Sequence, residues 1–366
     1  MEVHHVHRIP PGFGAYMKRC IVLAAVLSAL CAGALFGCTQ VYFKLLVSVP
    51  PDRLSFTVDG HDLSVPLVSS HPLGEEHEGA ERLLVVIHGG GLTAETYHER
   101  GVRIAREAWP GDGETIVAAP QFLEDRVGHG EQGVLFWNQD WRGGALSLSE
   151  DANANLPWVS SYEVLDRLIQ TVLEHNPGIQ LVLVVGHSAG GQFVGRYAAT
   201  NTLHARLQEL GVRMGYVVAN PSSYLYLSEV RYRSGPDGEA MEIPPGDLDA
   251  CPGYNSYKYG LDDLYGYAAE FSPDTIRGQL LSRPVLFVLG LDDTERDSGL
   301  DDRCQGEVQG TNRLERGRFY RLHLQSHAVE AQEDIHTWLE LPDVGHDASD
   351  MFAHPNFILT VREMFQ

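Results

Sequence analysis

Apolar runs of strand length alternate along this chain with longer stretches whose apolar residues have helical spacing. The predicted strands of this kind are residues 83–87, 115–120, 181–185, 214–219, 284–290 and 334–341. Where such a run is continuously apolar, both faces of the strand are expected to be covered. Upstream, residues 54–58 and 63–68 alternate around Asp59-Gly60, a dipeptide typical of hairpin turns. The pattern predicts an α/β protein in which two antiparallel N-terminal strands are followed by a mostly parallel sheet with helices on both faces.

Helical spacing predicts helices between and after these strands. They cover residues 93–108, 160–175, 192–200, 311–330 and 350–365. Thr93 stands at the start of the first helix, and Ser160 or Ser161 at the start of the second, as expected for N-cap residues.

The sequence Gly-His-Ser-Ala-Gly at residues 186–190 joins the predicted strand at 181–185 to a helix. A strand, this turn and a helix form a nucleophile elbow, in which the serine stands at the apex in a strained backbone conformation. Gly186 and Gly190 have no Cβ, so the strand and the helix can pass close together. The first N–H groups of the helix would lie near any oxyanion formed at Ser188. The alternative is an ordinary turn whose serine caps the helix.

Three motifs together resemble the α/β-hydrolase superfamily, and within it the serine esterases and lipases. They are the sequence at 186–190, His88-Gly89-Gly90-Gly91, and Gly345-His346 near the C-terminus. The resemblance spans about residues 82–366. It implies the α/β-hydrolase fold with a cap inserted at about residues 222–283, a segment rich in Tyr, Pro and Gly. A surface excursion that packs on itself is the alternative for this segment.

The resemblance also implies a catalytic triad in the chain order nucleophile, acid, base. Ser188 would be the nucleophile, and His346, after the last predicted strand, the base. Asp293 is the expected acid and Asp292 the alternative, since both follow the strand at 284–290. The fallback candidates for the base are His336 and His354.

Backbone N–H groups of a glycine-rich loop are expected to complete the site. In the resembled family, the loop after the strand at 83–87 supplies half of an oxyanion hole, since glycines let N–H groups approach a tetrahedral intermediate. Gly90 is the first candidate and Gly91 the second, and Ala189, after the nucleophile, would supply the other N–H. His88 is expected to stabilise the loop through hydrogen bonds rather than to react.

Aromatic residues are the candidates for the substrate pocket. Trp137 and Trp141 either line a cleft or fill the core, and the sequence favours neither alternative. Tyr224 lies near the start of the tyrosine-rich segment that would cover the nucleophile. These three residues are therefore the predicted substrate-binding side chains.

Charge and composition argue against several functions. The 366 residues include 49 acidic and 27 basic side chains, and the formal net charge is −22. An acidic surface repels phosphate backbones, so nucleic-acid binding is disfavoured. The acidic run at 292–302 lacks the spacing and the glycine of a calcium loop, so no metal is expected. Triad chemistry needs no organic cofactor.

The N-terminal segment resembles a bacterial lipoprotein signal. The chain begins at Met1, but Met17-Lys18-Arg19 is a second candidate start with a positive n-region. An apolar stretch then ends at Gly37, and Cys38 would carry the lipid. Export to the cell envelope and attachment to the membrane are expected, with an uncleaved anchor or a plain secretory signal as alternatives. The predicted organisation is a possibly spurious leader at 1–16, a signal at 17–37, a tether at 38–52 and a catalytic domain at 53–366.

Two of the five cysteines, Cys251 and Cys304, lie outside the N-terminal segment. In an exported protein they are expected to form a disulfide, with two free thiols as the alternative. This disulfide would connect the 222–283 segment to the loop after the next strand.

These features predict an exported hydrolase that cleaves carboxylic esters through an acyl-enzyme. The expected substrate is a small-molecule or lipid-like ester. A peptidase or amidase with the same triad is the rival reaction. A catalytically inactive hydrolase fold that serves as a binding lipoprotein is the rival from another class.

Overall fold

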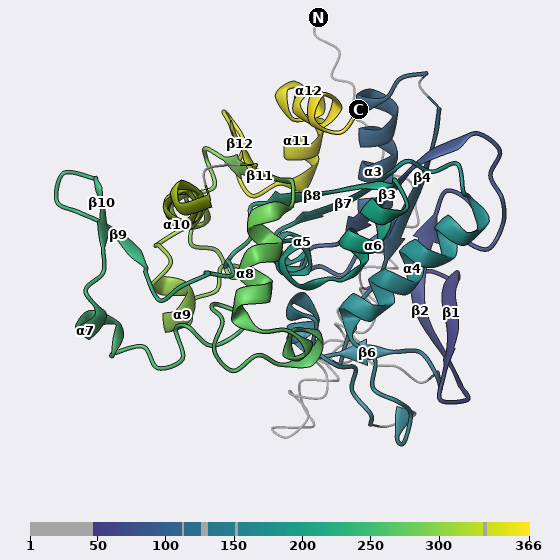
Figure 1. Ribbon diagram of the computed structural model, residues 1–366, viewed down its shortest axis with the longest axis horizontal. Coiled ribbons are helices and arrows are strands. Elements are labelled where there is room, and N and C mark those ends of the chain that lie inside the picture. The colour runs from purple at the N-terminus through teal and green to yellow at the C-terminus, as the bar shows by residue number, and fades with distance from the viewer. Residues whose placement is uncertain (1–46, 112, 126–130, 151–152, 332–334) are drawn as a thin grey trace, which may run out of the picture. The chain divides into compact units, whose positions relative to one another are not determined.

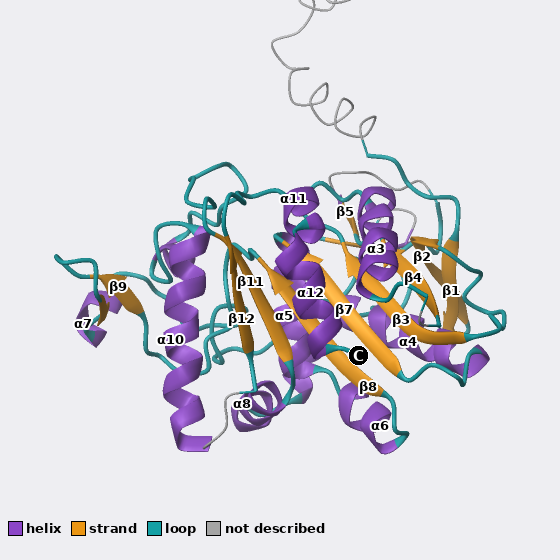
Figure 2. Ribbon diagram, turned by 90° about the horizontal axis from the view of Figure 1, so that it is seen from above, coloured by secondary structure: helices purple, strands orange, loops and turns teal. Residues whose placement is uncertain are grey.

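The computed structural model describes residues 47–366, except residues 112, 126–130, 151–152 and 332–334. The predicted leader, the predicted signal and Cys38 lie outside the described residues. An eight-stranded sheet with helices on both faces dominates the described part (Figures 1 and 2). The predicted α/β class is therefore confirmed.

The central sheet is antiparallel at one edge and parallel elsewhere. Its strand order is β1-β2-β4-β3-β7-β8-β11-β12, and the six strands from β4 onward in this order are parallel. The bounds are β1 (Arg53–Val58), β2 (His61–Ser69), β3 (Ala80–Ile87), β4 (Glu114–Pro120), β7 (Leu181–His187), β8 (Arg213–Ala219), β11 (Val285–Gly290) and β12 (Thr337–Leu341). β1 and β2 pair around Asp59 and Gly60, which both have positive φ, as the hairpin signal predicts.

Alternate side chains of the parallel strands enter two separate hydrophobic cores. On β3, Val85 and Ile87 belong to one core, and Leu84 and Val86 belong to the other. The first core is covered by α4 (Ser161–His175), α5 (Ala189–Thr200), α6 (Leu203–Glu209), α8 (Pro273–Ser282) and α10 (Arg313–Ala331). The second is covered by α3 (Ala94–Ala108), α11 (Ala348–Ala353) and α12 (Pro355–Met364), which Figure 2 shows together on one face. Burial on both faces explains why the strand sequences are continuously apolar.

Helix ends follow the local chemistry of the sequence. Ser160 caps α4 with its side chain, as predicted. The predicted single helix at 350–365 is wrong, because Pro355 separates α11 from α12. Proline has no N–H to donate and disfavours helical conformation in the residue before it. That residue, His354, instead accepts a hydrogen bond from the Asn356 N–H and so caps α12.

Two irregular segments interrupt the strand–helix alternation. Between β4 and α4 lie β5 (Leu123–Glu124), β6 (Phe136–Trp137) and the 3-10 helix η2 (Gln139–Gly143). Between β8 and β11, in addition to α8, lie the antiparallel pair β9 (Tyr232–Ser234) and β10 (Ala240–Glu242), α7 (Pro245–Leu248) and the 3-10 helix η4 (Gly266–Glu270). The short α9 (Cys304–Glu307) follows β11. No helix in the described part combines the length and the apolar character needed to cross a bilayer.

Candidate active site

β7 ends in a turn that has no room for a side chain at its two glycines. A Cβ on Gly186 would overlap the Gly190 carbonyl, and a Cβ on Gly190 would overlap the carbonyl of Ile87. Ser188, at the apex, has φ 58° and ψ −116°, a conformation that residues other than glycine rarely adopt. Its N–H donates to the Ala219 carbonyl at the end of β8, 2.9 Å away. The turn therefore holds Ser188 at the carboxyl ends of the central strands.

Three side chains from different loops form one hydrogen-bonded chain. Nε2 of His346 lies 3.0 Å from the hydroxyl oxygen of Ser188, and Nδ1 of His346 lies 2.8 Å from Oδ2 of Asp293. Because a carboxylate only accepts hydrogen bonds, the Nδ1–H donates to Asp293, and Nε2 is left to accept the serine proton. Of the two candidate acids, Asp293 is thus the one in contact with His346.

The other histidines near the motifs have different partners. His187 packs beside His346 with ring centroids 4.7 Å apart, and burial holds the pKa of His187 well below its ordinary value. His336 packs edge-on against Phe287, and His354 caps α12. Among the histidines considered from the sequence, His346 is the one that reaches Ser188.

A buried guanidinium supports the Asp293 carboxylate from the start of α10. Nη1 of Arg313 lies 3.5 Å from Oδ1 of Asp293, and Nη2 of Arg313 lies 2.8 Å from Oδ1 of Asp297. Both Arg313 and Asp293 are almost completely buried, whereas Asp297 is partly exposed. The hydrogen bond from Arg313 holds the pKa of Asp297 below its ordinary value. The positive charge of Arg313 therefore compensates two carboxylates beside His346.

Asn220 ties together the two loops that carry the acid and the imidazole. Its Oδ1 accepts a hydrogen bond from the Gly290 N–H at 3.0 Å, and its Nδ2 donates to the Gly345 carbonyl at 3.3 Å. The residue is fully buried and has φ 39°. Sequence reasoning missed it, although an asparagine directly after a buried strand tolerates positive φ and is a usable signal.

The glycine-rich loop after β3 lies on the other side of Ser188. Gly90, Gly91 and Ala189, the predicted oxyanion-hole residues, line one cavity together with Ser188. His88 holds this loop in place, since its Nε2 accepts from the Phe122 N–H at 2.9 Å and its Nδ1 donates to the Gly89 carbonyl at 2.8 Å. Burial lowers the pKa of His88 to about 4, so the ring is neutral near pH 7.

Comparison with solved structures identifies the fold. A poly(3-hydroxybutyrate) depolymerase from Bordetella parapertussis matches with a TM-score of 0.55 and 18% identity, covering 86% of this chain and 91% of that one. A poly(aspartic acid) hydrolase from Sphingomonas sp. KT-1 matches with a TM-score of 0.54 and 22% identity, covering 83% and 96% of the respective chains. The chain has the α/β-hydrolase fold. No protein-family model and no curated protein matches the sequence.

In this α/β-hydrolase fold, a cavity of about 620 Å³ opens beside Ser188. Its lining residues are Gly90, Gly91, Gln139, Arg142, Ser188, Ala189, Gln192, Ser222, Ser298, Gly299, Leu300, Asp301, Asp302 and Arg303. The wall comes from four places: the glycine-rich loop, η2, the elbow with the end of β8, and the loop between β11 and α9.

Trp137, Trp141 and Tyr224, the predicted substrate-binding side chains, do not line this cavity. Both tryptophans are completely buried, and Tyr224 is 4% exposed. The indole N–H of Trp137 donates to the Val159 carbonyl at 3.2 Å, and that of Trp141 donates to the Glu124 carboxylate at 3.0 Å. With their polar atoms satisfied internally, the two tryptophans belong to the core, which is one of the two alternatives that the sequence leaves open.

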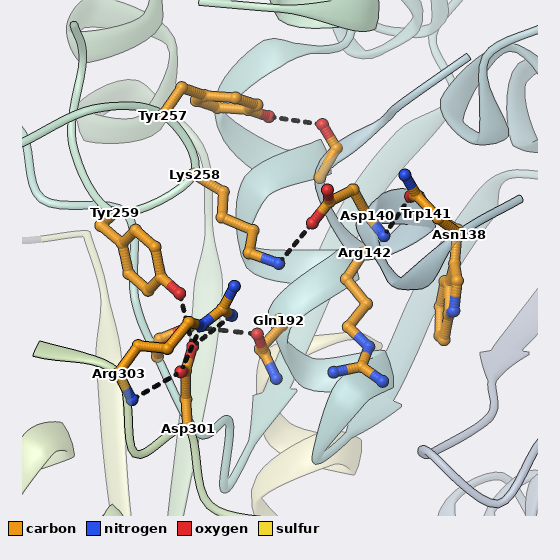
Figure 3. A network of polar contacts seen from close by, with 12 residues as sticks. Asn138, Asp140, Trp141, Arg142, Gln192, Tyr257, Lys258, Tyr259, Asp301 and Arg303 are labelled. Atoms are coloured by element: carbon orange, nitrogen blue, oxygen red, sulfur yellow. Dashed lines mark hydrogen bonds and ion pairs between the residues drawn. The ribbon is translucent and has the colours of Figure 1, made fainter. Parts of the chain in front are cut away.

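Sequence reasoning also missed three charged residues of the cavity wall, Arg142, Asp301 and Arg303, which Figure 3 shows around Gln192. Asp301 accepts two hydrogen bonds from Arg303, both 2.9 Å long, and one from the Tyr259 hydroxyl at 2.6 Å. Burial alone would raise the pKa of Asp301, but these hydrogen bonds lower it to about 2. The signal that points to such residues is position, since this loop follows β11 and opens at the same sheet edge as Ser188.

The predicted disulfide between Cys251 and Cys304 is confirmed. Cys304 begins α9 and directly follows Arg303, a residue of the cavity wall. The disulfide therefore ties the segment between β8 and β11 to the loop that forms one side of the cavity.

Proposed function

We propose that this chain is a serine hydrolase that cleaves carboxylic esters. The observation that supports the proposal best is the hydrogen-bonded chain from Ser188 through His346 to Asp293. A neutral imidazole with its Nε2 facing a serine hydroxyl can act as the general base that this reaction needs. The names of the two structural neighbours, a depolymerase and a hydrolase, are consistent with the same reaction class.

The proposed reaction begins when Nε2 of His346 takes the hydroxyl proton and Oγ of Ser188 attacks the ester carbonyl. The Asp293 carboxylate stabilises the imidazolium and keeps the Nδ1–H oriented. Negative charge develops on the former carbonyl oxygen, where the N–H groups of Ala189 and of Gly90 or Gly91 would donate hydrogen bonds.

Collapse of the tetrahedral intermediate breaks the bond to the alcohol oxygen, which takes the proton from His346. The acyl group is then bound to Ser188. A water molecule loses a proton to the same imidazole and attacks the acyl carbonyl. The second tetrahedral intermediate releases the carboxylic acid and returns the proton to Ser188.

The test is hydrolysis of 4-nitrophenyl esters of graded acyl length by the mature protein. Ser188→Ala should reduce kcat/KM by at least about 1,000-fold, because no other group supplies the nucleophile. Ser55→Ala, which removes an exposed hydroxyl on β1, is the matched control and should retain activity. Full activity of a folded Ser188→Ala protein would refute the proposal.

Two alternatives remain separable by experiment. A peptidase or amidase with the same triad would cleave an anilide as well as the ester with the same acyl group, whereas the proposed esterase would cleave the ester alone. A binding protein on an inactive hydrolase fold would not react with a fluorophosphonate probe. The proposed enzyme should be labelled by this probe as wild type and should not be labelled as Ser188→Ala.

We also propose that the chain is exported and attached to a membrane through a lipid on Cys38. The support is the sequence pattern of residues 17–38, a positive start followed by an apolar stretch and a small residue before the cysteine. Metabolic labelling with a radioactive fatty acid should mark the wild type and leave Cys38→Ser unlabelled. Equal labelling of both proteins would exclude this attachment site.

A further inference from the structure

The cavity beside Ser188 has a polar wall. Among its lining residues, Ala189 and Leu300 have apolar side chains, and the others are polar, charged or glycine. Sites for apolar acyl chains are lined mainly by hydrophobic and aromatic side chains. The tyrosines and tryptophans that would suit such a chain are packed into the core instead. The wall therefore suits a substrate with hydrogen-bonding or charged groups near the ester.

Arg142 stands next to the glycine-rich loop within this wall. Its Nη2 lies 3.9 Å from the position that a Cβ on Gly90 would occupy. Its side chain is 17% exposed and comes from η2, with the guanidinium carbon 5.7 Å from the Trp141 ring. A charge at this place would lie close to a substrate whose carbonyl oxygen faces the Gly90 loop.

The setting of Arg142 keeps its guanidinium in place. Its Nη2 lies 3.5 Å from Oε1 of Glu124, a carboxylate that is completely buried and that also accepts the indole N–H of Trp141. A guanidinium has five N–H donors in a rigid planar fork, so it can bind a second carboxylate while it keeps this contact.

Arg303 is the other cation among the lining residues of the cavity. Arg303 holds Asp301 through two contacts of 2.9 Å, and Lys258 holds Asp140 at 2.7 Å. Figure 3 shows the Arg142 and Arg303 side chains on either side of Gln192. Asp302 is exposed, so solvent and salt screen its charge.

From this arrangement we infer that the enzyme acts on esters that carry a carboxylate, and that Arg142 binds this carboxylate beside the scissile bond. The inference rests on the proposed ester hydrolysis. Half-esters of dicarboxylic acids and oligomers of hydroxy acids have this chemistry. In the first the carboxylate is on the acyl side of the ester, and in the second it is on the alcohol side.

Two pairs of matched esters test the inference and separate these sources. On the acyl side, mono-4-nitrophenyl adipate is compared with 4-nitrophenyl hexanoate. On the alcohol side, 4-acetoxybenzoate is compared with methyl 4-acetoxybenzoate. Wild type should prefer the anionic member of at least one pair by about 10-fold or more in kcat/KM, since a hydrogen bond between charged groups is stronger than one between neutral groups. Added salt should weaken the preference.

Arg142→Gln should remove this preference, so that kcat/KM for the anionic ester falls by about 10-fold or more relative to kcat/KM for the neutral ester, since only the anionic ester makes the charged contact. Arg142→Lys should keep part of it, because lysine supplies the charge without the planar fork. Arg318→Gln controls for net charge, since Arg318 pairs with Glu340 outside the cavity. If Arg142→Gln fails to fold because the buried Glu124 carboxylate loses the positive charge beside it, the double variant Arg142→Gln/Glu124→Gln removes both charges.

The outcomes distinguish this inference from the proposed function. A wild type that cleaves neutral and anionic esters equally, or an Arg142→Gln protein that keeps the anionic preference, overturns the inference alone. A wild type that cleaves none of the four esters overturns ester hydrolysis itself.

Discussion

Arg313 and His346 contact different oxygens of the same carboxylate, Arg313 at Oδ1 of Asp293 and His346 at Oδ2. Arg313 also binds Asp297, so that one buried cation is shared between two acidic groups beside the imidazole. A buried carboxylate without such compensation would be costly to keep ionised. Arg313 is therefore expected to hold the Asp293 carboxylate in position beside His346.

Arg313→Met should lower kcat by at least about 10-fold and leave KM nearly unchanged, because it disturbs the orientation of His346 rather than the cavity. Stability should fall by about 3–5 kcal/mol, since a buried pair loses one partner. Steady-state kinetics and urea unfolding measure the two effects. Arg313→Lys restores the charge and should recover part of the lost kcat and part of the lost stability. A folded Arg313→Met protein with wild-type kcat would contradict the positioning role.

Asn220→Asp should reduce kcat/KM by about 10-fold and also lower thermal stability, because a buried carboxylate oxygen would face the Gly345 carbonyl. Aspartate still accepts from the Gly290 N–H, but it cannot donate to the Gly345 carbonyl next to His346. Asn220→Ala loses both contacts and should also lower the free energy of unfolding by about 1–3 kcal/mol. Kinetics and thermal unfolding of both variants check this. A folded Asn220→Asp protein with wild-type kcat/KM would show that the Gly345 contact has no influence on the imidazole.

Removal of the disulfide should affect both stability and substrate binding. Cys251→Ser/Cys304→Ser frees a loop with a sequence separation of 53, which by loop entropy costs about 4 kcal/mol. KM should rise as well, because Arg303, next to Cys304, loses its anchor at the cavity. Calorimetry and kinetics measure these changes, and a reducing agent should alter wild type but not the variant. A lower Tm with unchanged KM would show that the disulfide stabilises the fold but has no influence on substrate binding in the cavity.

Stability should decrease as the pH falls from 6.5 toward 4. The pKa of His88 is about 4 in the folded chain against an ordinary value of 6.5, so the unfolded chain binds a proton in this window that the folded chain does not. This contribution of His88 to the free energy of unfolding is fully present above pH 6.5. It is lost on acidification and falls by about 2 kcal/mol between pH 7 and pH 5. Urea unfolding of wild type and His88→Gln at both pH values tests this, and equal pH slopes would argue against a buried neutral His88.

The sequence by itself determined the eight strands of the central sheet, the helices α3, α4, α5 and α10, and the order of the motifs. A strand buried on both faces must be continuously apolar, and the turn at Ser188 tolerates no side chain at Gly186 or Gly190. Such constraints act on residues that are close together in the chain, so they can be recognised in the amino-acid sequence. Ser188, Asp293 and His346 could be nominated for the same reason, since Ser188 directly follows β7 and the other two lie in the loops after β11 and β12.

Only the tertiary structure decided which side chains meet. Asn220 and Arg313 contact the loops of Asp293 and His346 across long sequence separations, and no local periodicity records such contacts. The same holds for Arg142, which reaches the cavity wall, while its neighbour Trp141 is buried in the core. Adjacent residues face different surroundings when the chain bends through a short 3-10 helix, so the choice between cavity and core depends on the packing of distant segments.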